Sequence, residues 1–256
     1  MSATTKQFIA STVSGVEEQH SIGESLSLHI LPGVFILAIF VVSAPFFMSA
    51  GYPPMLAIIV GAAFGLAFQV WHLYSLGMKL NGRLSLEGIV GYREPIPVWQ
   101  YFALIPLFVI LAFIIDGLTQ PLSTAFLARL SWIPAWFEMR DTSQLLEYSK
   151  SALTLTFGLN LLINGIFAPI IEELYFRGYL MSRLSRFGRL TPVVENALFT
   201  FYHFWQPYYW ISQFFFTLPW VSAVAWKKNI KVSIFTHMTL NLLGNLLLAA
   251  MILGQK

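Results

Sequence analysis

Residues 25–78 read SLSLHILPGVFILAIFVVSAPFFMSAGYPPMLAIIVGAAFGLAFQVWHLYSLGM and contain no Asp, Glu, Lys or Arg. A helix that spans a membrane needs roughly 20 mainly apolar residues. The run is long enough for two such helices, and the Gly51-Tyr52-Pro53-Pro54 break predicts where one ends and the next begins. Four more stretches also lack these charged residues: 95–115, 151–171, 196–226 and 232–255.

The composition agrees with a chain that lies largely in lipid. Hydrophobic residues make up 57% of the sequence and charged residues 11%, whereas a soluble domain is about one quarter charged. The chain has no cysteine, so disulfides and thiolate metal sites are excluded. Its polar first 25 residues lack a basic segment followed by an apolar core, and we expect no cleavable signal peptide.

Backbone groups in lipid must form their hydrogen bonds internally, and no segment alternates as barrel strands do. The sequence therefore predicts an all-α, polytopic transmembrane bundle of about seven helices. These spans are expected near 28–49, 54–78, 99–118, 151–180, 192–206, 208–226 and 232–253. We read one integrated domain, in which 1–118 supplies N-terminal membrane helices, 119–150 an interfacial connection or ordinary loop, and 151–256 the catalytic helices.

The distribution of Lys and Arg predicts the orientation in the membrane. With the N-terminus inside, seven crossings place ten basic residues inside: Lys6, Lys79, Arg83, Arg93, Arg183, Arg186, Arg189, Lys227, Lys228 and Lys231. Four lie outside: Arg129, Arg140, Lys150 and Lys256. We therefore expect an integral protein of the cell membrane whose active site opens towards the cytoplasm.

Three polar motifs lie within these predicted spans. They are Glu172-Glu173-Leu174-Tyr175-Phe176-Arg177, Phe199-Thr200-Phe201-Tyr202-His203 and His237-Met238-Thr239-Leu240-Asn241. Ionisable residues inside a membrane are functional candidates by default. Counting along two antiparallel helices from a turn near Gly188 places Glu172 and His203 at the same depth. Arg183 and Glu195 are expected where those helices meet water.

Spacing within each helix separates the roles of these residues. Residues four apart share a helix face, so Glu173 can pair with Arg177. Glu172 is rotated by about 100° from Glu173, and the two carboxylates cannot do the same job. Phe199 lies one turn before His203 and could line the cavity that His203 faces.

The chemistry that these residues suit is amide hydrolysis. A carboxylate in a buried site is a stronger base, so Glu172 could take a proton from water while His203 holds that water or shares the proton. His237 and Asn241 are four apart, and both could donate hydrogen bonds to the oxyanion of the tetrahedral intermediate. No cofactor is needed.

The three motifs, in this order on successive membrane helices, resemble those of the CPBP intramembrane endopeptidases. That family includes the type 2 CAAX prenyl endopeptidase and bacterial bacteriocin-processing or bacteriocin-immunity proteins. The resemblance covers roughly residues 150–250. It implies that Glu172 is the catalytic glutamate with His203 as its partner on the water, and that His237 and Asn241 form the oxyanion site. Glu173 and Arg177 are carried over as the remaining members of the first motif.

Two features depart from the family pattern. Glu195 and Asn196 stand where small residues such as Ser are common, and the Phe201-Tyr202 pair is bulkier than the Gly or Ala often found before the histidine. Both changes concern the shape of the substrate cleft and leave the chemistry intact.

Several other interpretations of the same residues stay open. Glu172, His203 and His237 could instead form a two-histidine, one-carboxylate zinc site. Buried Glu, His and Arg also build proton relays in transporters, and an immunity protein could keep the motifs without turnover. We expect a membrane-associated or lipidated peptide or protein as the substrate, the lipid bilayer as the surroundings, and no nucleic acid. His20 and His29 are expected at a surface or boundary, and His72 in a structural or interfacial position.

Overall fold

The computed structural model describes residues 19–139 and 141–256, which form helices with no strand in these ranges beyond a single bridge between Arg93 and Asn229. The predicted all-α class is confirmed. The α-helices are α2 (Ile22–Ser49), α3 (Pro54–Asn81), α4 (Val98–Leu127), α5 (Lys150–Leu162), α6 (Ala168–Glu172), α7 (Thr191–Tyr202), α8 (Trp210–Lys227) and α9 (Ile230–Leu253). The π-helices are η3 (Ile163–Phe167) and η4 (Glu173–Leu180). The 3-10 helices are η1 (Ala135–Phe137), η2 (Thr142–Glu147), η5 (Met181–Leu190) and η6 (Pro207–Tyr209).

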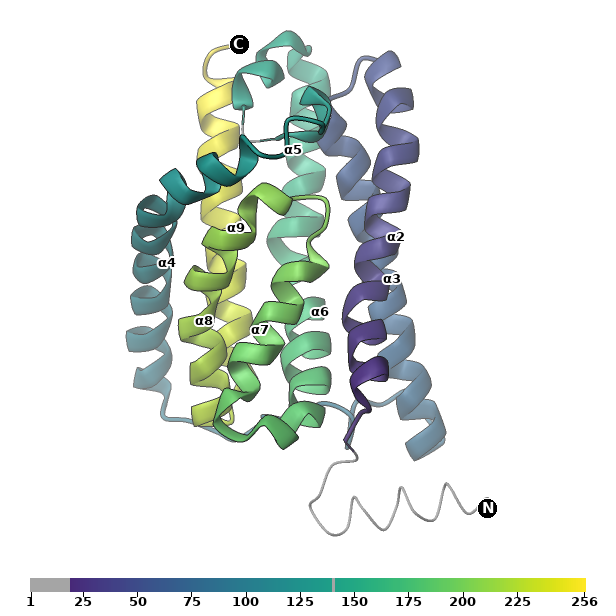
Figure 1. The fold of residues 1–256 in the computed structure, drawn as a ribbon, viewed down its shortest axis with the longest axis vertical. Coiled ribbons are helices and arrows are strands. Elements are labelled where there is room, and N and C mark those ends of the chain that lie inside the picture. The colour runs from purple at the N-terminus through teal and green to yellow at the C-terminus, as the bar shows by residue number, and fades with distance from the viewer. Residues whose placement is uncertain (1–18, 140) are drawn as a thin grey trace.

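The helices run side by side along one long axis (Figure 1). On one side of the bundle α2 packs along α3, and on the other α4 packs along α8 and α9. The hairpin of α7 and α8 lies between them, with α7 in contact with α2. The segments α5, η3, α6 and η4 continue one another and all pack on α9. This path carries the first motif into the centre of the bundle, beside the helices that carry the other two.

Side-chain caps and one close approach fix where the outer helices begin and meet. The Ser21 hydroxyl accepts from the Glu24 amide at 3.1 Å at the start of α2, and Asn229 caps α9 through the Val232 amide at 3.2 Å. Such caps satisfy amides that a helix start leaves without a partner. A Cβ atom on Gly61 would lie 2.7 Å from the Ile36 carbonyl oxygen, so only glycine allows α2 and α3 to approach this closely.

Five segments are long and apolar enough to cross a membrane, and the chain is an integral membrane protein. They are Ile22–Ser49, Pro54–Asn81, Val98–Leu127, Lys150–Tyr202 and Ile230–Leu253. About seven spans were predicted; α8 is not among the five, and α7 counts only as the end of the run Lys150–Tyr202. That run reverses at Gly188, which has φ 55°. The 12 residues of α7 extend only about 18 Å, against about 30 Å for the hydrocarbon core.

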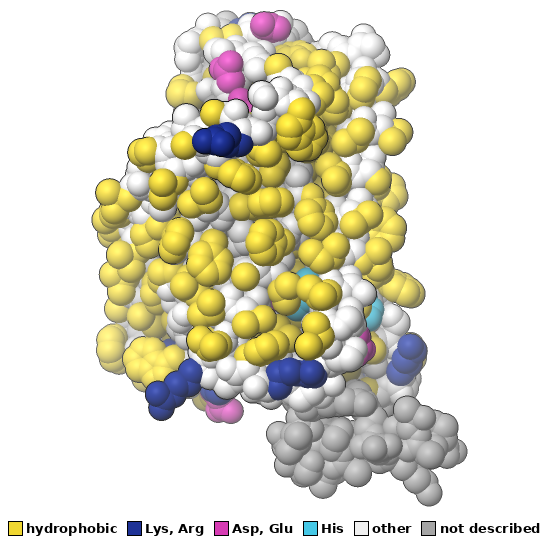
Figure 2. All heavy atoms as spheres, in the orientation of Figure 1, with side chains coloured by type: hydrophobic (Ala, Val, Ile, Leu, Met, Phe, Trp, Pro, Cys, Tyr) yellow, Lys and Arg dark blue, Asp and Glu magenta, His cyan; other side chains and the backbone are white. Residues whose placement is uncertain are grey.

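The flank of the bundle is apolar and its charges gather at the two ends (Figure 2). Large side chains stand outward along the flank, among them Val42, Phe102 and Leu118, each more than 70% exposed. Outward-facing apolar side chains of this density fit a lipid environment. Of the basic residues used to predict the orientation, Lys6 and Arg140 lie outside the described residues.

Four predictions of exposure were wrong, three of them for His20, His29 and Arg183 and the fourth for Glu195. His20 and His29 are buried, and Arg183, expected at the water boundary, is 5% exposed. Burial is possible because each has a partner: His20 contacts the Tyr179 hydroxyl, His29 the Ser25 carbonyl, and Arg183 donates to the carbonyls of Tyr179 and Ile89. A polar residue near a helix end therefore did not mark the surface.

The connection between α4 and α5 is shorter than the predicted 119–150, because α4 continues to Leu127. Its described part holds the short helices η1 and η2 and lies across the end of the bundle, over the α7–α8 hairpin (Figure 1). Trp136 and Phe137 point inward and contact the buried Phe40, with ring centroids 5.6 and 5.1 Å away.

Candidate active site

The first motif lies where the chain changes from α-helical to π-helical winding. Glu172 ends α6 and Glu173 begins η4. Such π-helical turns are rare and are frequent at functional sites. A Cβ atom on Gly178 would lie 2.6 Å from the Val90 side chain. Glycine therefore lets η4 pack directly against the loop that follows α3.

Glu173 is the centre of a buried polar cluster. Its carboxylate lies 3.4 Å from Nε of Arg177, accepts a short hydrogen bond from the Ser233 hydroxyl and lies 2.9 Å from Nδ1 of His237. Ser233 and His237 are one turn apart on α9, so a single helix face supplies both donors. Two hydrogen-bonding side chains and the ion pair with Arg177 compensate for the full burial of this carboxylate.

Arg177 joins this cluster to α7. Its Nε atom lies 3.6 Å from Oε2 of Glu195, and its guanidinium carbon lies 3.6 Å from the centroid of the Phe199 ring. Arg177, Glu173 and Glu195 are all fully buried. One guanidinium therefore faces two carboxylates, and the stacked ring covers the face of the cation.

Glu195 is the member of this cluster that sequence reasoning missed. It was expected where α7 meets water, but its exposed fraction is 0%. Both carboxylate oxygens lack a hydrogen-bond partner among the described residues. Glu195, Phe199 and His203 are spaced by four, which places them on one helix face. That spacing was the available signal, and it connects Glu195 to the second motif.

Glu172 takes no part in the Glu173 cluster through hydrogen bonds. Its Oε1 atom accepts from the Tyr202 hydroxyl at 3.1 Å, and that hydroxyl in turn accepts from Nε2 of Gln69 at 3.2 Å. Glu172 is buried and interacts electrostatically with His237. The two adjacent glutamates thus have different surroundings, as their rotation about the helix predicted.

His203 is the residue that follows the last turn of α7. Its Nδ1 atom lies 2.9 Å from the Phe199 carbonyl oxygen, and the side-chain amide nitrogen of Gln213 from α8 lies 3.0 Å from Nδ1 and 3.3 Å from Nε2. A proton on Nδ1 satisfies the carbonyl, and Nε2 then accepts from the Gln213 amide. Phe199 also packs on the imidazole, with ring centroids 4.7 Å apart. Within the described residues, no hydrogen bond joins His203 to Glu172.

The third motif places its two side chains on different partners. His237 contacts Glu173, whereas Nδ2 of Asn241 donates to the carbonyl oxygen of Asn164 at 2.8 Å. One turn further along, Asn160 donates to Oδ1 of Asn245 at 2.6 Å. Polar side chains of this kind hold membrane helices together. Asn241 is therefore positioned by the η3 backbone as well as by its own helix.

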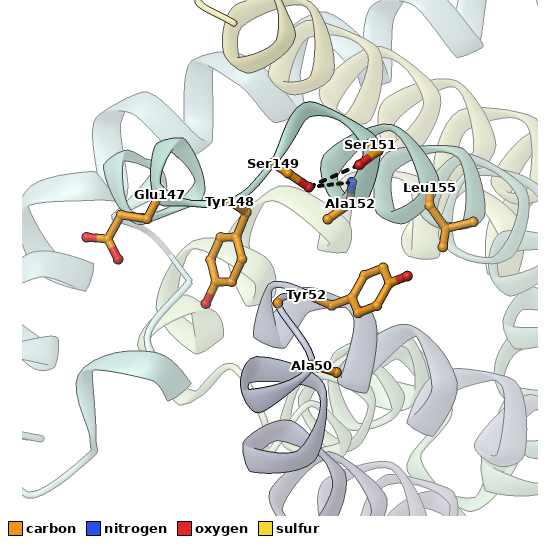
Figure 3. A pocket seen from close by; sticks show the side chains of 9 residues that line it. Ala50, Tyr52, Glu147, Tyr148, Ser149, Ser151, Ala152 and Leu155 are labelled. Atoms are coloured by element: carbon orange, nitrogen blue, oxygen red, sulfur yellow. Dashed lines mark hydrogen bonds between the residues drawn. The ribbon is translucent and has the colours of Figure 1, made fainter.

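Two cavities lie at the ends of the bundle, away from the motifs. The larger, of about 700 Å³, opens between the α2–α3 turn and the start of α5 (Figure 3). The rings of Tyr52 and Tyr148 line it, and Ser149 caps α5 at its edge. The second, of about 530 Å³, lies at the opposite end. Neither is lined by a residue of the three motifs.

The structure does not bring Glu172, His203 and His237 together as the ligands of one zinc ion. Across 19–139 and 141–256, no three or more His, Cys, Asp or Glu side chains come together in a way that could hold a metal ion. Glu172, His203 and His237 each have separate protein partners instead.

A helical bundle with five candidate membrane spans and a buried cluster of carboxylates, histidines and an arginine fits an intramembrane enzyme. A family model described as "Type II CAAX prenyl endopeptidase Rce1-like" matches residues 154–243, which contain all three motifs. This segment therefore carries an Rce1-like type II CAAX prenyl endopeptidase family domain, which implies an intramembrane peptidase. Comparisons with curated proteins and with solved structures found no match.

Proposed function

We propose that this protein hydrolyses a peptide bond of a membrane-associated or lipidated peptide or protein, using a water molecule activated by Glu172. The observation that carries the proposal is that two adjacent buried glutamates have different hydrogen-bond and ion-pair partners. Glu173 is occupied by Arg177, Ser233 and His237, whereas Glu172 has the Tyr202 hydroxyl as its hydrogen-bond donor. Glu172 therefore keeps acceptor capacity for a water proton.

In the proposed reaction, Glu172 takes a proton from water and the hydroxide oxygen bonds to the carbonyl carbon of the substrate. Nε2 of His203 accepts the second hydrogen bond of that water, which replaces the one from the Gln213 amide. The proton on Glu172 then passes to the amide nitrogen, the carbon–nitrogen bond breaks, and an acid and an amine leave. Because no hydrogen bond joins Glu172 and His203, the water itself would connect them.

His237 and Asn241 would stabilise the oxyanion. Nδ1 of His237 faces the Glu173 carboxylate, and the ring would donate to the substrate through Nε2 when that atom carries a proton. Asn241 would donate by exchanging one of the two contacts that its Nδ2 atom makes with Asn164. No metal takes part in this scheme, and no cofactor is required.

The orientation follows from the distribution of basic residues, with residues 79–98 and 183–191 on the cytoplasmic side. The site then opens towards the cytoplasm, from which a peptide substrate would enter.

The test is proteolysis by the full chain reconstituted in lipid, read as new peptide termini in a membrane peptidome. Replacing Glu172 by Gln preserves shape and removes the base, so turnover should fall by about 10²–10⁴-fold while the melting temperature stays unchanged. Glu87→Gln, at an exposed site outside the motifs, is the matched control and should keep full activity. Full activity in Glu172→Gln would overturn the mechanism, and an absence of new termini with the native chain would overturn the peptidase.

A second measurement addresses the zinc interpretation. Exhaustive chelation should leave the turnover of the purified protein unchanged. If one zinc per chain were found, and its removal and return abolished and restored turnover, the metal mechanism would replace the one proposed here.

A further inference from the structure

The smaller cavity lies at the end of the bundle where α7 begins and α8 ends, away from the candidate active site. It has a volume of about 530 Å³. Part of its lining comes from the loop before α4, from η5, from α8 and from the turn after α8. This part includes Tyr92, Ser185, Arg189, Ser222, Trp226 and Lys228. Figure 1 shows that the start of α7 and the end of α8 lie at the same end of the bundle. Along α7, His203 is about 18 Å from the first residue of the helix.

The cavity is positively charged and lacks an internal counterion. Arg189 and Lys228 are both exposed, and neither forms an ion pair within the described residues. The lining contains no Asp or Glu within the described ranges, and Glu94 contacts Lys228 through its backbone amide, which donates to the Lys228 carbonyl at 2.8 Å. Two uncompensated cations beside one cavity attract an anion.

Uncharged hydrogen-bond donors also line the cavity. Ser185 and Ser222 bring hydroxyl groups to the lining. The first turn of α7 forms another part of the wall, and no side chain caps that helix start. The Thr191 amide donates to the Gly188 carbonyl and Pro192 has no N–H group, so the two hydroxyl groups are the neutral donors of the lining.

Two residues with long side chains at this cavity have backbone conformations that glycine adopts more easily. Tyr92 has φ 56° and Lys228 has φ 53°, and in the described parts of the chain they are the two residues other than glycine with positive φ. The Lys228 ammonium lies 4.7 Å from the centroid of the Tyr92 ring. Left-handed conformations are unfavourable for residues with a Cβ atom, so the backbone carries an energetic cost at both of these residues.

The surroundings of the cavity are apolar and exposed. Trp226 is 75% exposed and Leu190, next to Arg189, is 62% exposed. Tryptophan is enriched at the level of lipid headgroups, and the neighbouring flank of the bundle is apolar (Figure 2). A ligand here would meet cations at one end and hydrocarbon at the other.

We propose that this cavity binds the phosphate-bearing headgroup of an anionic phospholipid. Arg189 and Lys228 contact the phosphate, Ser185 and Ser222 donate to its oxygens, and the acyl chains run along the flank beside Trp226. A lipid fits better than a soluble phosphate because the charged lining is continuous with exposed apolar side chains. Basic pockets between helices on the cytoplasmic side of a membrane suit such headgroups.

The experiment measures binding of phosphatidylglycerol and phosphatidylcholine to the purified full chain by native mass spectrometry. Wild-type protein should retain phosphatidylglycerol in preference to phosphatidylcholine. Arg189→Gln combined with Lys228→Gly should weaken the apparent affinity for phosphatidylglycerol roughly 30-fold. A matched control, Lys79→Gln with Arg83→Gln, removes two charges from the same end of the bundle outside the cavity and should change it less than about twofold.

The Lys228→Gly single variant separates binding from folding. Glycine relieves the positive φ at this position, so the melting temperature should stay equal or rise while phosphatidylglycerol binding falls. An unchanged affinity in this variant, equal losses in both double variants, or equal retention of the two lipids would overturn the proposal. Displacement of the lipid by millimolar inorganic phosphate, with the same stabilisation of the protein, would show a soluble phosphate site instead and would also overturn it.

Discussion

The Nε atom of Arg177 lies 3.6 Å from Oε2 of Glu195, and both side chains are fully buried. The same nitrogen lies 3.4 Å from Glu173. Both of these carboxylates depend on Arg177, but not equally. Glu173 also accepts from Ser233 and lies 2.9 Å from His237, while the oxygens of Glu195 lack a hydrogen-bond partner in the described ranges.

This asymmetry predicts which second substitution rescues the loss of Arg177. Arg177→Ala should destabilise the fold by about 3–5 kcal/mol, because it leaves buried charges without a partner. Adding Glu195→Gln should recover more of that loss than adding Glu173→Gln. In the described ranges no hydrogen-bond donor contacts Glu195, whereas Ser233 and His237 still contact Glu173. Thermal melts in detergent on the single and the two double variants measure the difference. A larger recovery with Glu173→Gln would contradict the assignment.

The contact between Gln213 and His203 predicts a positioning role for Gln213. Replacing Gln213 by Leu removes the donor to Nε2 of His203, and kcat should fall roughly tenfold, on the scale of one hydrogen bond, with KM and the melting temperature little changed. Gln213→Asn, which keeps a shorter amide, should retain part of the activity. Equal losses in kcat and melting temperature would indicate that Gln213 serves only packing.

The orientation can be checked by labelling, because the chain has no cysteine. Leu84 and Ser143 are both exposed, the first in the loop after α3 and the second in η2. Cysteine at Leu84 should react with a membrane-impermeant reagent only in inverted vesicles, and cysteine at Ser143 only in intact cells. Labelling of both positions from the same side would rule out the proposed orientation.

His20 lies just before α2, and burial lowers the pKa of its imidazole to about 4 from an ordinary value of 6.5, with a smaller contribution from Arg183. The ionisable groups around it are Glu24, His72, Tyr179, Arg183 and Arg186. Between pH 6.5 and pH 4 the unfolded chain binds more protons at this site than the folded chain does, so the free energy of unfolding decreases as the pH falls.

The corresponding measurement compares melting temperatures over this pH range for the native chain and for His20→Gln. The variant should lose less stability than the native chain between pH 6.5 and pH 4. Parallel pH profiles would assign the acid sensitivity to other groups.

Local rules were enough to predict the helical class and the three motifs. A long run without charge needs lipid around it, and a lipid-embedded backbone must be helical. Spacing by four predicted that Glu173 could pair with Arg177, and the two side chains lie 3.4 Å apart. The rotation of Glu172 away from Glu173 likewise follows from helix geometry, and it separates the surroundings of the two carboxylates.

Tertiary packing decided what these residues contact. Glu195 and Tyr202 reach the first motif from α7, and Gln213 reaches the second from α8, because the chain reverses at Gly188 and again between α7 and α8. Whether a polar side chain near a helix end faces water or a protein partner depends on which segment packs beside it. Periodicity along one helix contains no information about that neighbour, and for this reason the sequence alone placed Glu195 and Arg183 at the surface while the folded protein buries both.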